Sequence, residues 1–172
     1  MLLKLIYFKM GALAEAPQML MRCDNIHYQY LMSWEHHSDE WPNVKSRLAF
    51  KQLPMLRVDG QHEICQSIAI LKYLESQAGL SISDPIHAAK ANVILQSAQE
   101  LFAPLNPTVN FAVDDGFLSK RDAMRPILAN RFQELSNCLE ENNSKFFIDN
   151  KSRAAEFTTF HHLDLSKHLM IV

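Results

Sequence analysis

A proline-led hairpin that runs directly into a helix limits the folds open to this chain. Residues 52–60 read Gln-Leu-Pro-Met-Leu-Arg-Val-Asp-Gly, so a short strand follows Pro54 and closes at Asp59-Gly60. An Asp-Gly pair between two extended segments is a strong hairpin signal, and residues 61–65 supply the returning strand. Ser67 then stands at the expected N-cap of an amphipathic helix over Ile68–Glu75.

The residues before this hairpin predict a strand, a helix and a second strand. The apolar run at residues 2–8 indicates a buried strand, and apolar residues at helical spacing indicate a helix over Ala12–Cys23. Residues Tyr28–Met32 predict the second strand, and the polar stretch Trp34–Leu48 is expected to form a loop or a short helix. Residues 1–77 are therefore expected to form a small α/β domain.

The remainder of the chain, residues 84–172, changes character and predicts helices only. Asp84 is a suitable helix cap with Pro85 in the first turn, and that helix is expected to reach about Phe102. Pro104 and Pro107 are expected to break or end it, because proline cannot donate a helical hydrogen bond.

Two further helices are expected after these prolines. Ser119 to Asp122 resembles a capping box and predicts a long helix that ends near Glu141. A last helix is expected over Ala154–Leu169, after a connector at residues 146–150. The second part of the chain is thus predicted to be an all-α domain.

Composition excludes several classes of protein. The chain has 17 Lys and Arg against 19 Asp and Glu, and a basic excess is what a nucleic-acid binder needs to neutralise phosphates. No apolar run approaches the roughly 20 residues of a membrane span, and the apolar N-terminus is too short for a signal peptide. We therefore expect a soluble cytoplasmic protein with neither nucleic-acid nor membrane partners. Three separated cysteines predict reduced thiols and no zinc site.

The order of these elements is accompanied by short motifs that occur at specific places. They are Tyr7-Phe8, Trp41-Pro42-x-x-Lys45, Phe50-x-Gln52-Leu53-Pro54-x-Leu56-x-Val58-Asp59-Gly60, Gln66-Ser67-x-Ala69-Ile70-x-x-Tyr73-Leu74 and Ala155-Glu156-Phe157-Thr158-x-Phe160-x-x-Leu163-Asp164. This arrangement resembles the glutathione S-transferase family over nearly the whole chain, and the details resemble its tyrosine-using, sigma-like branch.

The resemblance implies an architecture and a function. The fold would be an α/β N-terminal thioredoxin-like domain (βαβ-ββα, residues 1–77) plus an all-α C-terminal domain (residues 84–172). That second domain would be incomplete, because chains of the family continue into further helices. The implied partners are glutathione, a small electrophile for detoxification and a second copy of the chain in a homodimer, with Phe50 near the interface. No metal or organic cofactor would be needed, since glutathione serves as co-substrate.

The chemistry of two segments fits a peptide that carries carboxylates. The residue before a cis proline can present its backbone groups as an adjacent strand would, and Leu53-Pro54 is placed to do so. The helix after Gln66 offers free N–H groups and a positive dipole end, with the Ser67 hydroxyl as a further donor. By resemblance, Gln66 and Ser67 would hold the γ-glutamyl carboxylate of glutathione.

The other binding residues and the catalytic residue follow from the resemblance alone. Trp41 and Lys45 would hold the glycyl end of glutathione, and Gln52 would contact its peptide backbone. Tyr7 would bind and activate the thiol, because a hydroxyl that donates to sulfur favours the thiolate. A free thiol has a pKa of about 8.5, so lowering it by about two units makes the sulfur mostly anionic at neutral pH.

Each of these residues also has a purely structural interpretation. Tyr7 can be a core aromatic residue at a strand end, Ser67 a helix cap and Trp41 a cover for its loop. Pro54 can serve the fold alone. Leu13 stands where related chains carry a basic residue that helps to polarise the tyrosine, and Arg153 stands where they carry a hydroxyl cap.

Two other functions therefore stay open. A non-catalytic glutathione-binding or structural relative is favoured by Leu13 and by the short C-terminus. A thiol–disulfide oxidoreductase would need a cysteine at about residues 8–13, and none is present there.

His161, Asp164 and His168 share a face of the last helix, for which a solvated or interface role is preferred over a metal site.

Overall fold

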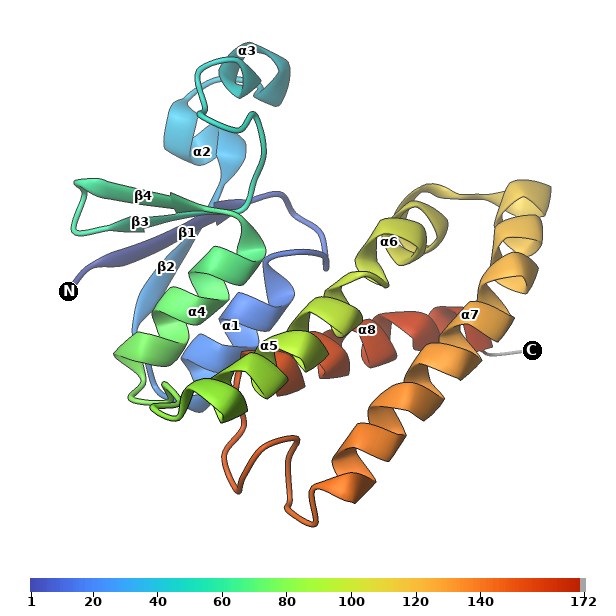
Figure 1. Cartoon of the computed structure of the whole chain (residues 1–172). Helices are drawn as coiled ribbons and strands as arrows, with labels where there is room; N and C mark the ends of the chain where they lie inside the picture. The colour runs from blue at the N-terminus through green and yellow to red at the C-terminus, as the bar shows by residue number, and fades with distance from the viewer. Residues whose placement is uncertain (171–172) are drawn as a thin grey trace. The chain divides into compact units, whose positions relative to one another are not determined.

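The computed structural model describes residues 1–170 and divides the chain into two compact units, which meet between Leu80 and Ser81 (Figure 1). The first unit holds all four strands, β1 (Leu3–Tyr7), β2 (Tyr28–Met32), β3 (Met55–Val58) and β4 (His62–Cys65). The second unit is helical throughout the described residues. The expected α/β and all-α architecture is confirmed.

The sheet of the first unit has the strand order β2-β1-β3-β4. Strand β1 pairs in parallel with β2 and antiparallel with β3, and β3 forms the hairpin with β4. Four of the five residues of β1 are buried, as a central strand covered on both faces requires. Helices α1 (Glu15–Cys23) and α4 (Ser67–Gln77) pack against each other, which completes the βαβ-ββα pattern.

The first unit differs from the sequence prediction at three places. The stretch expected to be a loop or one short helix forms two short helices, α2 (Ser33–His37) and α3 (Trp41–Lys45). Helix α1 begins at Glu15 rather than at Ala12. Ser67 is the first residue of α4, so the prediction of Ser67 as the N-cap is wrong. Gln66 takes that position with a φ of 72°.

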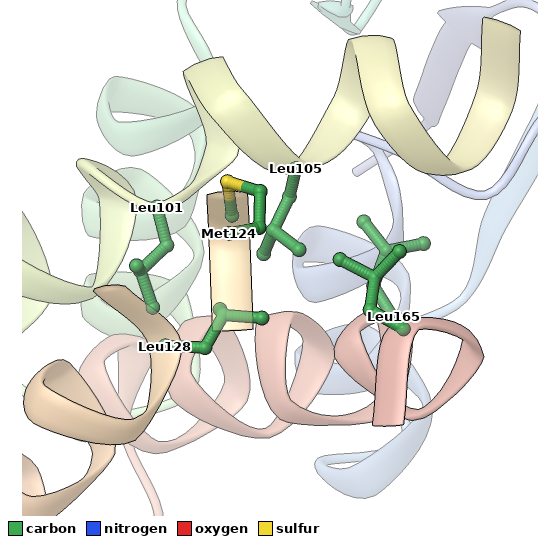
Figure 2. Packing of buried hydrophobic residues seen from close by; sticks show 6 residues of the cluster. Leu101, Leu105, Met124, Leu128 and Leu165 are labelled. Atoms are coloured by element: carbon green, nitrogen blue, oxygen red, sulfur yellow. The ribbon is translucent and has the colours of Figure 1, made fainter. Parts of the chain in front are cut away.

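The second unit contains α5 (Pro85–Gln99), α6 (Phe102–Phe111), α7 (Asp114–Glu141) and α8 (Ala154–Met170). The predicted cap of α5 is confirmed, because the Asp84 carboxylate accepts the His87 N–H at 2.7 Å. Figure 2 shows five labelled members of a buried cluster that joins three of the helices. The cluster consists of Leu101, Leu105, Met124, Leu128, Leu165 and Leu169.

The helix from Pro85 is expected to reach about Phe102 and to be broken or ended by Pro104 and Pro107, but α5 already ends at Gln99, before both prolines. Both lie within α6, a separate helix that begins at Phe102. Pro104 therefore falls in a first turn, where the missing N–H has no helical acceptor to lose. Helix α7 also begins earlier than expected, with Asp114 and Asp115 in its first turn, where acidic side chains suit the helix dipole.

The start of α8 retains half of a capping box. The Glu156 carboxylate accepts the backbone N–H of Arg153 at 2.8 Å and that of Phe147 at 2.9 Å. Of the solvated and interface roles expected for the histidine face of this helix, the solvated role is wrong for His161, which is buried together with His162. Within residues 1–170, no helix is both long enough and apolar enough to cross a bilayer.

Candidate functional site

A cavity of about 250 Å³ lies in the first unit, where β1, α3, the segment before β3 and the start of α4 meet. Its lining consists of Phe8, Leu13, Trp41, Lys51, Gln52, Leu53, Pro54, Gln66 and Ser67. Six of the residues predicted for glutathione binding are thus brought together: Trp41, Gln52, Leu53, Pro54, Gln66 and Ser67. Tyr7 and Lys45 are not part of the lining.

One wall of the cavity is backbone that no strand uses. The Leu53–Pro54 bond is cis, and both residues are buried. Strand β3 begins only at Met55, so Leu53 lies outside the sheet ladder. Its backbone groups therefore lie at the cavity wall, where an extended peptide can pair with them.

A second part of the cavity lining is the N-terminus of α4. The first hydrogen bond at this end runs from the Ile70 N–H to the Gln66 carbonyl, so the N–H groups before Ile70 have no acceptor inside the helix. Free N–H groups and the helix dipole favour an anion at this point. The Ser67 side chain is buried beside them, and Gln66 donates from its amide to the Gln52 side chain at 3.1 Å.

The positive φ of Gln66 is unusual for a residue with a side chain. Such a backbone conformation costs on the order of 1–3 kcal/mol and persists only where the surrounding structure enforces it. Here it turns the chain from β4 directly into α4 and brings the Gln66 side chain to the Gln52 amide. The strained residue thus lies in the wall that also holds the helix terminus.

Tyr7 lies at the end of β1 and is 4% exposed. Burial raises the pKa of its hydroxyl, and the Glu15 carboxylate raises it further, against a hydrogen bond from the backbone N–H of Leu13. The phenol is therefore protonated at neutral pH and is a hydrogen-bond donor rather than a base. Leu13, whose backbone N–H donates to the Tyr7 oxygen, and Phe8, whose ring contacts the Tyr7 ring, both line the cavity.

Aromatic rings join Tyr7 to the cavity rim. The Phe8 ring lies 5.2 Å from the Tyr7 ring and 5.2 Å from the Trp41 ring, the latter in an edge-on contact. Phe8 was present in the sequence motif but was not predicted to be a site residue. Phe8 lies beyond the end of β1, so strand alternation does not place its side chain, and its position next to Tyr7 in the sequence was the signal that pointed to it.

The sequence analysis predicted Lys45 as the site lysine, but a different lysine, Lys51, lines the cavity. Lys45 is the last residue of α3 and is exposed, whereas Lys51 lines the cavity directly before Gln52. Lys45 ends α3 and Lys51 lies in the segment between α3 and β3, and each carries its ammonium on a flexible side chain. Sequence adjacency to Gln52 was the signal that pointed to Lys51.

The described residues do not gather a metal-binding set of three His, Cys, Asp or Glu side chains. What the cavity offers instead is a carboxylate-binding helix end, a backbone edge and a protonated phenol next to its wall. That combination fits a short peptide with a terminal carboxylate and a group near Tyr7 that gains from a hydrogen-bond donor.

Comparison with known proteins gives consistent matches. Residues 3–76 match the family described as glutathione S-transferase, N-terminal domain. The chain is 30% identical over 158 residues to a hematopoietic prostaglandin D synthase of Gallus gallus, covering 90% of this chain and 74% of that one. It is 28% identical over 176 residues to a probable glutathione S-transferase 6 of Caenorhabditis elegans, covering 98% of this chain and 83% of that one.

Solved structures share the fold. A Fasciola hepatica sigma class glutathione S-transferase superposes with a TM-score of 0.81 at 18% identity, covering 97% of this chain and 80% of that one. A Caenorhabditis elegans glutathione S-transferase gives a TM-score of 0.80 at 23% identity, covering 99% and 84%.

Proposed function

Because this chain belongs to the glutathione S-transferase family, we propose that it binds glutathione and joins it, through its thiolate sulfur, to a small electrophile. The observation that carries the proposal is the convergence of Trp41, Gln52, Leu53, Gln66 and Ser67 on one cavity. These residues come from separate elements, and a merely structural role for each would not require them to meet.

Glutathione would lie with its γ-glutamyl carboxylate at the start of α4, where Ser67 and the free N–H groups donate. The backbone of Leu53 would pair with the cysteinyl part, and Gln52 would contact the peptide. Trp41 would hold the glycyl end, together with Lys45 or Lys51 as the cation. This orientation places the thiol near the end of β1, where Tyr7 lies.

Tyr7 would donate its hydroxyl hydrogen to the sulfur and so favour the thiolate. The thiol proton leaves to solvent, and a sulfur electron pair forms the new carbon–sulfur bond as the leaving group departs with its own bonding pair. The Leu13 N–H supports the donor, since a hydrogen bond accepted by the phenol oxygen strengthens the one that it donates.

The Leu13 N–H can take over the role of the basic side chain that related chains carry at this position. A basic side chain is absent there, but the N–H is a backbone group and is present with any residue other than proline. Activation by Tyr7 therefore favours an active transferase over a non-catalytic relative of the family.

The proposal also includes a homodimer and a cytoplasmic location. A homodimer is supported by Phe50, whose aromatic side chain is 63% exposed on the first unit. A cytoplasmic location agrees with the three free cysteines of the described chain, because thiols stay reduced in that compartment. The sigma-like assignment and the identity of the electrophile belong to the proposal as well.

Replacement of Ser67 tests the binding mode. Ser67→Ala removes one donor to a charged carboxylate, which costs about 1–3 kcal/mol, or roughly 5- to 150-fold in the dissociation constant for glutathione. Isothermal titration calorimetry measures this constant. Ser76→Ala, at an exposed position of the same helix, is the matched control and should bind as the original chain does. Equal affinity for all three proteins would exclude Ser67 from the site.

A further inference from the structure

The backbone just beyond the end of β1 accepts a hydrogen bond from a side chain of the neighbouring strand β2. The ladder between β1 and β2 ends at the pair Tyr7 and Met32, so the carbonyl of Phe8 lies beyond it. That carbonyl accepts the Tyr30 hydroxyl at 2.7 Å and the Met10 N–H at 2.9 Å. A side chain of β2 thereby fixes the backbone at the point where β1 enters the site.

The Phe8 carbonyl belongs to a residue that lines the cavity and that directly follows Tyr7. Phe8 lines the cavity and contacts the Trp41 ring edge-on, while Tyr7, the residue before it, carries the hydroxyl assigned to the thiol. The Phe8 carbonyl belongs to the peptide plane after Phe8, so a movement of this carbonyl would reach Tyr7 through the backbone of Phe8. The hydrogen bond from Leu13 and the hydrogen bond to sulfur both depend on the position of that tyrosine.

The Tyr30 hydroxyl keeps its proton throughout any useful assay range. Burial raises its pKa to about 12, and the negative charge of the Glu15 carboxylate acts in the same direction. The group therefore donates to the Phe8 carbonyl at every pH at which the thiol of glutathione titrates.

We propose that Tyr30 is a positioning residue of the transferase site, which acts through the Phe8 carbonyl to hold Tyr7 where its hydroxyl meets the glutathione sulfur. The inference rests on the proposed function, because it concerns the same thiol. It requires no contact between Tyr30 and glutathione.

The same strand provides a matched control. Tyr28 and Tyr30 are two residues apart on β2, so they point to the same face of the sheet. The Tyr28 hydroxyl donates to the Gln18 side chain of α1 at 3.2 Å and so does not reach the strand end. Tyr28→Phe and Tyr30→Phe each remove one hydroxyl from the same face, but only the second removes a hydrogen bond to the Phe8 carbonyl.

The readout is the thiol pKa of bound glutathione, followed by thiolate absorbance against pH. Tyr30→Phe should raise this pKa by about half a unit or more, which lowers the ratio of thiolate to thiol about threefold. Affinity for S-methylglutathione, which has no thiol to ionise, should change less than about twofold. Tyr28→Phe should leave both values unchanged.

A double substitution shows whether Tyr30 acts through Tyr7. In the Tyr7→Phe background the donor to sulfur is already lost, so adding Tyr30→Phe should leave the thiol pKa where Tyr7→Phe puts it. A further rise in the double variant would overturn the proposed route through Tyr7.

The remaining outcomes separate the inference from the proposed function. A lowered thiol pKa in the original chain together with the same value in Tyr30→Phe overturns the role of Tyr30 and leaves the transferase proposal intact. An unshifted thiol pKa in the original chain refutes thiol activation itself.

Discussion

Acid should destabilise this protein through one buried histidine of the helical unit. His162 is 1% exposed, and its Nδ1–H donates to the Ala98 carbonyl of α5 at 2.8 Å. Burial lowers the pKa of His162 to about 4, with a further lowering by His161 and a partial opposition by the Ala98 hydrogen bond. The ring of Phe102 covers the side that faces α6, at 6.1 Å between ring centroids.

The sign and size of the effect follow from linkage between protonation and folding. The unfolded chain protonates His162 at about pH 6.5, whereas the folded chain does so only near pH 4, so the unfolded state binds more protons between these values. The stabilisation is complete above about pH 6.5 and is lost as the pH falls toward 4. At about pH 5 the loss amounts to about 2 kcal/mol. His161, whose pKa burial also lowers, adds to the loss.

Urea unfolding at about pH 7.5 and pH 5 measures this loss, with His162→Asn as the test variant. The asparagine amide takes nearly the place of Nδ1 and can still donate to Ala98, but it does not titrate. The difference in unfolding free energy between the two pH values should therefore be about 2 kcal/mol smaller in His162→Asn. His168→Asn, at an exposed position of the same helix, should behave like the original chain. Equal losses in His162→Asn and the original chain would refute the reasoning.

Substitutions at two further positions test the start of α8 and the loop before α1. Arg153→Ser should raise the free energy of unfolding by roughly 1 kcal/mol, and the unfolding midpoint with it. The reason is that the buried Nε and Nη1 of Arg153 lack hydrogen-bond partners, whereas serine would complete the capping box with Glu156. A lower midpoint would show that the ion pair with Asp149 dominates. Leu13→Ala should leave the thiol pKa of bound glutathione unchanged because the donor is backbone, whereas Leu13→Pro removes that N–H and should raise it. A raised value in Leu13→Ala would contradict this.

The parts of the fold that could be predicted are those set by local chemistry. Asp59-Gly60 closes the hairpin by itself, with Gly60 at a φ of 71°, and Asp84 caps α5 with its own carboxylate. Gln66 could not be predicted, because a left-handed backbone at a residue with a side chain is imposed by the packing around it. Nothing in the local sequence distinguishes Gln66 from Ser67 as the residue before the helix.

The prolines of the helical unit show a second limit. If the helix from Pro85 continued, Pro104 would interrupt it. Because a new helix begins at Phe102, Pro104 is instead a normal residue of a first turn. The packing of Leu101 and Leu105 against α7 and α8 decides where that helix begins. Such contacts are long-range and do not appear in the sequence pattern.

Most of the site could be predicted, because its side chains belong to short motifs on separate elements. The lining of the cavity by Trp41, Gln52 and Ser67 agrees with the sequence prediction. The Leu13 donor could not be found, since every residue type except proline carries a backbone N–H. The choice between Lys45 and Lys51 depends on the path of the chain after α3, which no motif specifies.

The most direct test of the account is the thiol pKa of glutathione bound to the original chain and to Tyr7→Phe, measured by thiolate absorbance against pH. The account predicts a value well below the free-thiol pKa of about 8.5 in the original chain and a return toward 8.5 in Tyr7→Phe, with little change in affinity. Glutathione that binds to the original chain with a pKa of about 8.5 would contradict it.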